Sequence, residues 1–165
     1  VYKRQGLHNR RYFFDYFEHN LVKLNPSHVG LALISFDIDN FKHINDNLGH
    51  HVGDEVIKTV AHTAANTLRT NDVIARIGGD EFIIALPRTT LLQAKEIAKR
   101  ILENIRSHRF TTKEGADFSV TASLGVAYHH QNKLIALDVK SMMESADTAL
   151  YQSKRAGKNR FTVAA

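Results

Sequence analysis

The feature that most constrains the fold is a pair of short apolar runs separated by two glycines and two acids. Val73–Ala75 and Phe82–Leu86 flank the segment Arg76-Ile77-Gly78-Gly79-Asp80-Glu81. Two glycines between such runs predict a β-hairpin, because both turn positions can adopt positive φ without a steric clash. We therefore expect two strands joined by a tight turn, with Asp80 and Glu81 at its tip.

A second pair of acids, at the end of another predicted strand, indicates that the acids at the hairpin tip belong to a metal site. Taken alone, they read as a solvated acidic turn, but the apolar run Leu31–Phe36 leads straight into Asp37-Ile38-Asp39. Strand alternation places Asp37 and Asp39 on one face, and a carboxylate at the end of a buried strand is costly unless a cation or donors compensate it. If the hairpin lies beside this strand, the acids converge on Mg²⁺ or Mn²⁺.

The remaining pattern predicts a mixed α/β domain. A strand is expected over Phe118–Val126, followed by a polar loop rich in His and Gln, and then a helix from about Ser141 to Arg155 that Gly157 ends. A short strand over Arg160–Val163 closes the sheet. Two further segments keep helical spacing of apolar residues: Val52, Val56, Ile57, Val60, Ala61, Ala64, Ala65 and Leu68, and then Leu91, Ala94, Ile97, Ala98, Ile101, Leu102 and Ile105.

Composition predicts one soluble domain over residues 1–165. The chain has 165 residues, no cysteine and 43% hydrophobic residues, which suits a single core that buries about 70% of the unfolded surface. No apolar run approaches the roughly 20 residues of a membrane span, and no signal peptide opens the chain, so we expect a cytoplasmic setting. Without thiolates, any metal is held by oxygen or histidine.

The net charge of +5 does not indicate a nucleic-acid polymer as partner. The basic residues are scattered, the chain has no Trp, and most of its nine Phe fall at core-like positions rather than along a basic stripe. Nucleotide phosphates explain the excess of positive charge equally well.

Together, these spaced motifs resemble the GGDEF domain, the diguanylate cyclase domain that joins two GTP molecules into cyclic di-GMP. The resemblance runs from Gly6-Leu7-His8-Asn9-Arg10-Arg11 to Gly157-Lys158-Asn159-Arg160, which is nearly the whole chain. It implies a central mixed, largely antiparallel sheet flanked by helices, similar to the palm of nucleotidyl cyclases and polymerases. It also implies that the 3′-hydroxyl of one GTP attacks the α-phosphorus of the other and expels pyrophosphate. A second such step closes the ring and expels a second pyrophosphate.

The resemblance assigns the metal ligands and the proton acceptor. Two Mg²⁺ or Mn²⁺ ions per active site are expected, with Asp37, the Ile38 main-chain carbonyl, Asp80 and Glu81 as ligands. Asp80 is the expected proton acceptor, and Glu81 supports the same site. A side chain at Gly78 or Gly79 would meet the nucleotide.

The segment Phe41–Asp54 is rich in side chains that can read base edges. Asn offers both a donor and an acceptor, and Asp accepts from paired N–H groups such as guanine N1 and N2, a combination that prefers guanine to adenine. The resemblance gives these roles to Asn45 and Asp54, adds His50 as a substrate contact, and places Lys42 on the phosphates. Without the resemblance, Asp54 reads as a first-turn helix acid and Lys42 as a surface lysine.

Two lysines bracket the end of the last helix. Lys154 and Lys158 would stabilise the helix dipole without any ligand, but the resemblance makes them a clamp for the β- and γ-phosphates. Arginine is usual at the position of Lys158. Lysine keeps the charge and loses the bidentate fork, so we expect a change in phosphate affinity rather than a loss of function.

The motif Arg69-Thr70-Asn71-Asp72 precedes the hairpin and is weak by itself, since it also fits a solvated helix end with a capping acid. At this distance from the glycine pair it matches the inhibitory site of the family, where Arg and Asp hold the product cyclic di-GMP. Arg100 corresponds to a third contributor. We therefore expect product inhibition.

Each domain would hold one GTP, so the resemblance implies an antiparallel homodimer as the active state. No coiled coil is present to enforce it, and we expect an upstream sensor or dimerising region outside this sequence, which could anchor the full-length protein to a membrane. The isolated domain is expected to be monomeric and slow. Tyr2-Lys3-Arg4-Gln5 departs from the Asp-x-Leu-Thr block of the family, a block that couples to upstream helices.

Three alternatives remain open from the sequence. The first is a catalytically inactive GGDEF domain that acts as a receptor for GTP or cyclic di-GMP, although the acids and Lys154 that such domains typically lose are intact. The second is a polymerase-like palm acting on nucleic acid, for which 165 residues leave no room for thumb and finger regions. The third is a protein-interaction domain that uses its helical faces.

Overall fold

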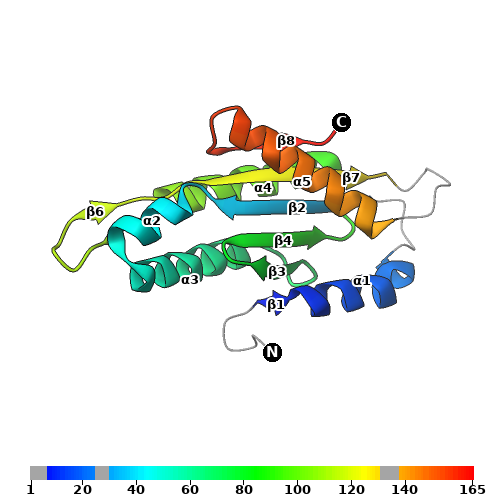
Figure 1. The fold of residues 1–165 in the computed structure, drawn as a ribbon. Coiled ribbons are helices and arrows are strands. Elements are labelled where there is room, and N and C mark those ends of the chain that lie inside the picture. Colours follow the sequence, from blue (N-terminus) through cyan, green and yellow to red (C-terminus); the bar gives the residue numbers. More distant parts are fainter. Residues whose placement is uncertain (1–6, 25–29, 131–137) are drawn as a thin grey trace.

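The computed structural model describes residues 7–24, 30–130 and 138–165, and within Arg10–Leu24 it describes side chains only as far as residue 17. The departure at Tyr2–Gln5 and most of the polar loop before the last helix lie outside the described residues. A six-stranded sheet forms the centre of the fold, in the order β1-β3-β4-β2-β7-β8 (Figure 1). Its strands are β1 (His8–Asn9), β2 (Leu31–Ile38), β3 (Val73–Gly78), β4 (Glu81–Leu86), β7 (Ala122–His129) and β8 (Arg160–Val163).

The sheet is mixed and largely antiparallel, which confirms the predicted fold class. β2 pairs antiparallel with β4 on one side and with β7 on the other, and β3 pairs antiparallel with β4. Only the outermost pairs, β1 with β3 and β7 with β8, are parallel. β2 therefore lies inside the sheet, and all eight of its residues are buried.

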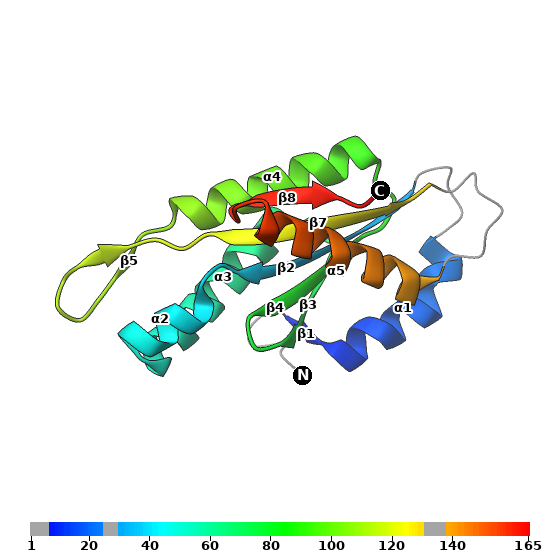
Figure 2. The same cartoon turned by 45° about the horizontal axis from the view of Figure 1, so that its top comes forward.

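Helices cover both faces of the sheet (Figures 1 and 2). α3 (His50–Thr67) and α4 (Leu91–Ser107) pack on one face, where Phe36 and Phe82 stack with their ring centroids 4.8 Å apart. α1 (Arg10–Leu24) and α5 (Val139–Arg155) pack on the other face. The short helix α2 (Phe41–Leu48) links β2 to α3. Among the described residues, no helix has the length and apolar character that crossing a bilayer requires.

The helices predicted from apolar spacing form where expected. α3 ends at Thr67, so Leu68 is its C-cap rather than its last turn. α4 begins with a capping box in which Thr90 and Gln93 satisfy each other's backbone N–H groups. α5 begins at Val139, two residues before the predicted start, because the Asp138 side chain caps the Lys140 N–H.

The strand predicted over Phe118–Val126 needs correction at both ends. Residues 118–126 do not form one strand: Phe118 belongs to β6 (Asp117–Phe118), which pairs with β5 (Phe110–Thr111) in a separate ribbon. β7 begins only at Ala122 and continues to His129, because β2 supplies pairing partners along that whole length.

Candidate active site

The two acidic strand ends meet, as the sequence predicts. Asp37, near the end of β2, is the direct cross-strand partner of Glu81, the first residue of β4. Asp80 lies in the turn just before Glu81, and its charge contributes to raising the pKa of Asp37. Three carboxylates from two segments far apart in sequence therefore share one corner of the sheet.

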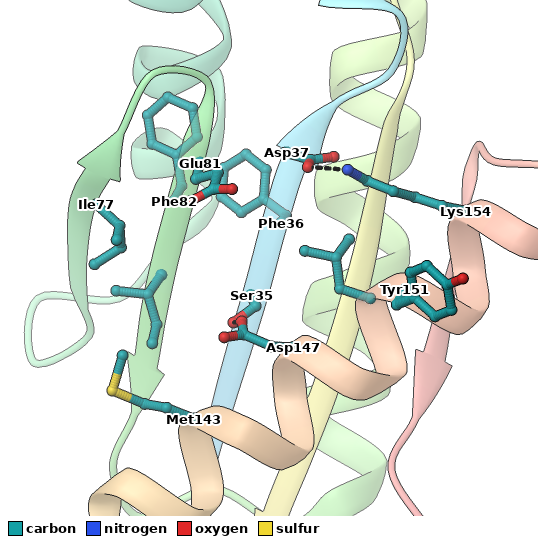
Figure 3. A pocket seen from close by; sticks show the side chains of 12 residues that line it. Ser35, Phe36, Asp37, Ile77, Glu81, Phe82, Met143, Asp147, Tyr151 and Lys154 are labelled. Carbon is teal, nitrogen blue, oxygen red and sulfur yellow. Dashed lines mark hydrogen bonds and ion pairs between the residues drawn. The ribbon is translucent and has the colours of Figure 1, made fainter.

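Asp37 is the most unusual of these carboxylates. It is only 4% exposed, and its Oδ2 accepts a hydrogen bond from Lys154 Nζ of α5 (Figure 3). Its other oxygen, Oδ1, is buried and has no hydrogen-bond partner among the described residues. Burial raises the pKa of Asp37 to about 6, against the opposing effect of Lys154 and with smaller contributions from Asp80 and Asp39. Burying a carboxylate oxygen without a hydrogen-bond donor costs free energy, and a cation bound beside Asp37 would offset that cost.

Asp39 differs from Asp37 and needs no cation. Its carboxylate accepts hydrogen bonds from the Thr121 hydroxyl at 2.7 Å, the Ser123 hydroxyl at 2.6 Å and the Asn159 main-chain N–H at 3.0 Å. These donors tie the end of β2 to the start of β7 and to the turn before β8. Hydrogen-bond donors therefore compensate Asp39, which is one of the two possibilities that the sequence left open for this pair.

The oxygen atoms at this corner suit a divalent metal that is coordinated partly by the protein and partly by a bound substrate. The described residues contain no cluster of three or more His, Asp or Glu side chains that would hold a metal alone. Mg²⁺, however, is commonly bound by one or two carboxylates together with substrate phosphates and water. The buried Asp37 oxygen, the facing Glu81 and the adjacent Ile38 carbonyl could supply such an incomplete set of oxygen ligands.

The two-residue hairpin turn lies one residue later than predicted, and Glu81 is outside its tip, in β4. Gly79, with φ +51°, and Asp80 form the turn, whereas Gly78 is the last residue of β3 and pairs with Glu81 across a register shift. Arg76 Nε donates to the Gly79 carbonyl at 2.8 Å and stabilises the turn. A Cβ added at Gly78 or Gly79 would have no protein atom within 4 Å, so space is open on this side of the acids.

The predicted base-reading residues lie on α2 and α3. Asn45 is partly buried on α2, and its side chain packs directly on Gly53 of α3, where an added Cβ would lie 1.8 Å from Asn45 Oδ1. Gly53 is thus needed for the position of Asn45, and the sequence analysis missed it. Asp54 follows Gly53 and is exposed, as are His50 at the start of α3 and Lys42 on α2.

The two C-terminal lysines reach the same corner from α5 and the turn after it. Lys154 pairs with Asp37. Lys158 adopts a left-handed conformation with φ +64°, and its Nζ donates to Asn40 Oδ1 at 2.6 Å, next to the start of α2. Both ammonium groups therefore contact residues at the end of β2.

Side chains beneath α5 also contribute to this corner, and the sequence analysis missed them. A cavity of ≈ 280 Å³ lies between α5 and the β3–β4 hairpin, with Ile77, Met143 and Tyr151 in its wall (Figure 3). At its floor, the Ser35 hydroxyl donates to Asp147 Oδ1 at 2.7 Å. The only sequence signal for Ser35 was a polar residue on the buried face of an apolar strand.

The candidate inhibitory site is a separate cavity of ≈ 480 Å³ lined by Arg69 and Arg88. Asp72 accepts from Arg69 Nε at 3.2 Å and from Nη2 at 3.1 Å, and the Asp72 side chain is fully buried. Thr89 also accepts from Arg69 Nη2 at 2.6 Å. Asp72 thus holds the guanidinium in place rather than facing the cavity. Arg100 is exposed on α4 and does not line this cavity.

Comparison with known families decides the relationship. Residues 5–160 match the family described as diguanylate cyclase, GGDEF domain. The chain belongs to the GGDEF family. The resemblance inferred from the spaced motifs is therefore confirmed over nearly the whole chain.

Individual relatives support the same conclusion for this GGDEF domain. It is 38% identical over 156 residues to the uncharacterized protein YhcK of Bacillus subtilis, covering 94% of this chain and 43% of that protein. It is 37% identical over 159 residues to diguanylate cyclase DgcP of Pseudomonas aeruginosa, covering 96% of this chain and 23% of that protein. The chain thus spans less than half the length of these two relatives.

A solved structure of a GGDEF domain has the same fold as this chain. The GGDEF domain of DgcB from Caulobacter crescentus, solved in complex with cyclic di-GMP, superposes with a TM-score of 0.86. The two chains are 32% identical, and the match covers 95% of this chain and 91% of that one.

The raised pKa of Asp37 predicts pH-dependent metal binding. Below about pH 6 the carboxylate takes up a proton that competes with a divalent cation, so metal affinity falls as the pH falls. We expect Mn²⁺, used as a paramagnetic probe, to bind about tenfold more weakly at pH 5 than at pH 7.5. Water proton relaxation measures this affinity, with Asp37→Asn as the control that removes the pH dependence. An affinity that is the same at both pH values would contradict the assignment of Asp37 as a ligand.

Proposed function

We propose that this GGDEF domain is a diguanylate cyclase that condenses two GTP molecules into cyclic di-GMP with release of two pyrophosphates. The observation that carries the proposal is the buried Asp37 oxygen beside Glu81, which has no hydrogen-bond partner in the described part of the chain, in a corner that also receives Lys154. The arrangement fits a site that is completed by a metal and a triphosphate.

Asp37, the Ile38 carbonyl, Asp80 and Glu81 would hold one or two Mg²⁺ ions in this proposal. The ions would neutralise triphosphate charge and lower the pKa of the attacking 3′-hydroxyl. Lys154 and Lys158 would bind the β- and γ-phosphates, with Lys42 beside them. Lys154 would exchange one anionic partner, Asp37, for another when the nucleotide enters.

The guanine would be read at the corner between α2 and α3. Asn45 is held on Gly53, so its amide is fixed before a base arrives, and Asp54 follows on the next residue. An acidic acceptor there favours guanine N1 and N2 over the adenine edge. His50, at the first turn of α3, would add a contact to the substrate.

Because one domain would hold one GTP, the reaction would need two domains with their sites face to face. The rate per domain should then rise with protein concentration. We expect chromatography to detect cyclic di-GMP in reactions with GTP and Mg²⁺, with Asp80→Ala inactive at every concentration. GTP binding without any product, even at high protein concentration and in a dimerised fusion, would favour the receptor alternative.

Gly78→Ala separates contact with the nucleotide from an effect on folding. Its Cβ would meet no protein atom, and Gly78 does not require positive φ, so the free energy of unfolding should change by less than about 1 kcal/mol. If the nucleotide lies on the hairpin, the methyl group should reduce kcat/KM about tenfold or more. Steady-state kinetics and thermal unfolding test this together, and unchanged kinetics would place the substrate elsewhere.

Product inhibition is proposed for the cavity beside Arg69. Arg69 is held by Asp72 and Thr89, which leaves its guanidinium preorganised for a phosphate or a guanine edge. We expect Arg69→Ala to raise the cyclic di-GMP concentration that halves the rate by about tenfold or more, with little change in the uninhibited rate. Lys95→Ala, which removes a cation from the exposed side of α4, serves as the control. Equal inhibition of all three proteins would contradict this assignment.

A further inference from the structure

Two side-chain contacts join one face of β2 to one side of α5 (Figure 3). Ser35 donates to Asp147 Oδ1 at 2.7 Å, and Lys154 pairs with Asp37. Both contacts line the same cavity, but only the second belongs to the candidate active site, and the first is used by no step proposed above.

The two contacts are spaced differently on the strand and on the helix, and the long Lys154 side chain spans the difference. Ser35 and Asp37 are two residues apart, so both point to the same face of β2, about 6.7 Å from each other along the strand. Asp147 and Lys154 are seven residues apart, which is two turns or about 10.5 Å along the same side of a helix. Both contacts can form together in only one placement of α5 along β2, since a shift of one turn, about 5.4 Å, would separate both pairs.

β2 is the fixed partner in this arrangement. It lies inside the sheet between β4 and β7, and Ser35 is only 4% exposed. A buried hydroxyl needs a hydrogen-bond partner, and the Asp147 carboxylate provides one. The hydrogen bond therefore ties α5 to a buried strand inside the sheet, two helical turns before Lys154.

We propose that Asp147 is a positioning residue that, through Ser35, fixes α5 so that Lys154 is held over Asp37. The consequence for nucleotide binding rests on the proposed function, in which Lys154 binds the phosphates. The placement of Lys154 in the free protein does not rest on it.

The first test measures Lys154 in the absence of nucleotide. An ammonium held against a buried carboxylate reacts slowly with an amine-specific reagent, so the labelling rate of Lys154, read by mass spectrometry, reports its position. We expect Asp147→Ala to raise this rate several-fold. Asp147→Asn should keep the wild-type rate, because its amide oxygen still accepts from Ser35. Glu144→Ala, which removes one carboxylate from an exposed position of the same helix, is the matched control.

The second test measures GTP affinity with Mg²⁺ present, in single and double variants. If Asp147 acts through Lys154, Asp147→Ala weakens binding about tenfold in the wild-type background and has no effect in a Lys154→Ala background. Independent effects that add would overturn the proposal, as would a Lys154 labelling rate that Asp147→Ala leaves unchanged while Asp37→Asn raises it. Faster labelling in a protein that binds no GTP would support the positioning role and contradict the proposed function instead.

Discussion

Asp37→Asn is expected to reduce cyclic di-GMP formation by at least about a thousandfold while making the nucleotide-free domain more stable. Cyclic di-GMP formation falls because the variant keeps the shape of the side chain but removes the charge that would hold the metal. The stability of the nucleotide-free domain rises because the native carboxylate is buried with one oxygen unpartnered among the described residues. The neutral amide reduces the cost of that burial.

The sign of the stability effect follows from the pKa. Burial raises the pKa of Asp37 from its ordinary value to about 6, so the folded domain binds this proton more tightly than the unfolded chain does. The stability that the protonated group contributes is present at low pH and is lost as the pH rises through about 6. At pH 7.5 we expect Asp37→Asn to raise the free energy of unfolding by about 1 kcal/mol, or Tm by roughly 2–4 °C.

Calorimetry at pH 7.5 and at pH 4 checks this prediction alongside the activity assay. The advantage of the variant should be smaller at pH 4, where the native Asp37 is itself protonated. Added Mg²⁺ should raise Tm for the native protein more than for the variant. Asp39→Asn is the matched control, and it should lower stability because it weakens three hydrogen bonds. If the native protein is more stable than Asp37→Asn at pH 7.5, the inference that burial of the charged Asp37 costs stability is wrong.

Gly125→Ala has the largest expected effect on folding. Gly125 lies in β7 beneath α5, where an added Cβ would be 2.0 Å from the Ala146 carbonyl oxygen and 2.2 Å from the Leu150 nitrogen. Backbone atoms of a helix cannot turn aside as a flexible side chain can, so α5 would have to rise from the sheet. We expect a loss of about 3 kcal/mol, which corresponds to a fall in Tm of roughly 6–12 °C.

The same displacement should reach the candidate active site. Further along α5, the buried Ser153 hydroxyl contacts the Leu124 carbonyl, and Lys154 follows it directly. Any protein that remains folded should therefore bind GTP more weakly. Thermal unfolding and GTP titration at a temperature below both transitions test this, and Gly78→Ala, whose Cβ meets no protein atom, is the control for the unfolding measurement alone. Wild-type stability in Gly125→Ala would show that α5 does not need this close approach.

The sequence predicted those parts of the structure that depend on local pattern. The hairpin, the amphipathic helices α3 and α4 and the closing strand β8 follow from periodicity and turn residues, and the meeting of Asp37 with Glu81 follows once β2 lies beside β4. The division of residues 118–126 between β6 and β7 was missed, because the pairing partners of each piece lie far away in the sequence.

Tertiary contacts explain what the sequence could not distinguish at the site. Asp37 and Asp39 look equivalent in the pattern Asp-Ile-Asp, yet one oxygen of Asp37 has no donor among the described residues, whereas Asp39 accepts from three donors, in or beside β7 and in the turn before β8. Likewise, nothing in the sequence indicated that Ser35 and Asp147, 112 positions apart, form a hydrogen bond. The roles of Asn45, Asp54, Lys158 and Arg69 remain predictions.

The most direct test of the proposed chemistry is the stoichiometry of the reaction. The domain, fused to a dimerising coiled coil, would be incubated with GTP and Mg²⁺, and nucleotides and pyrophosphate would be quantified by ion-exchange chromatography. We predict one cyclic di-GMP and two pyrophosphates for every two GTP consumed, and no product from Asp37→Asn. GTP that is bound but not consumed, or that yields GDP and phosphate instead, would contradict the proposal.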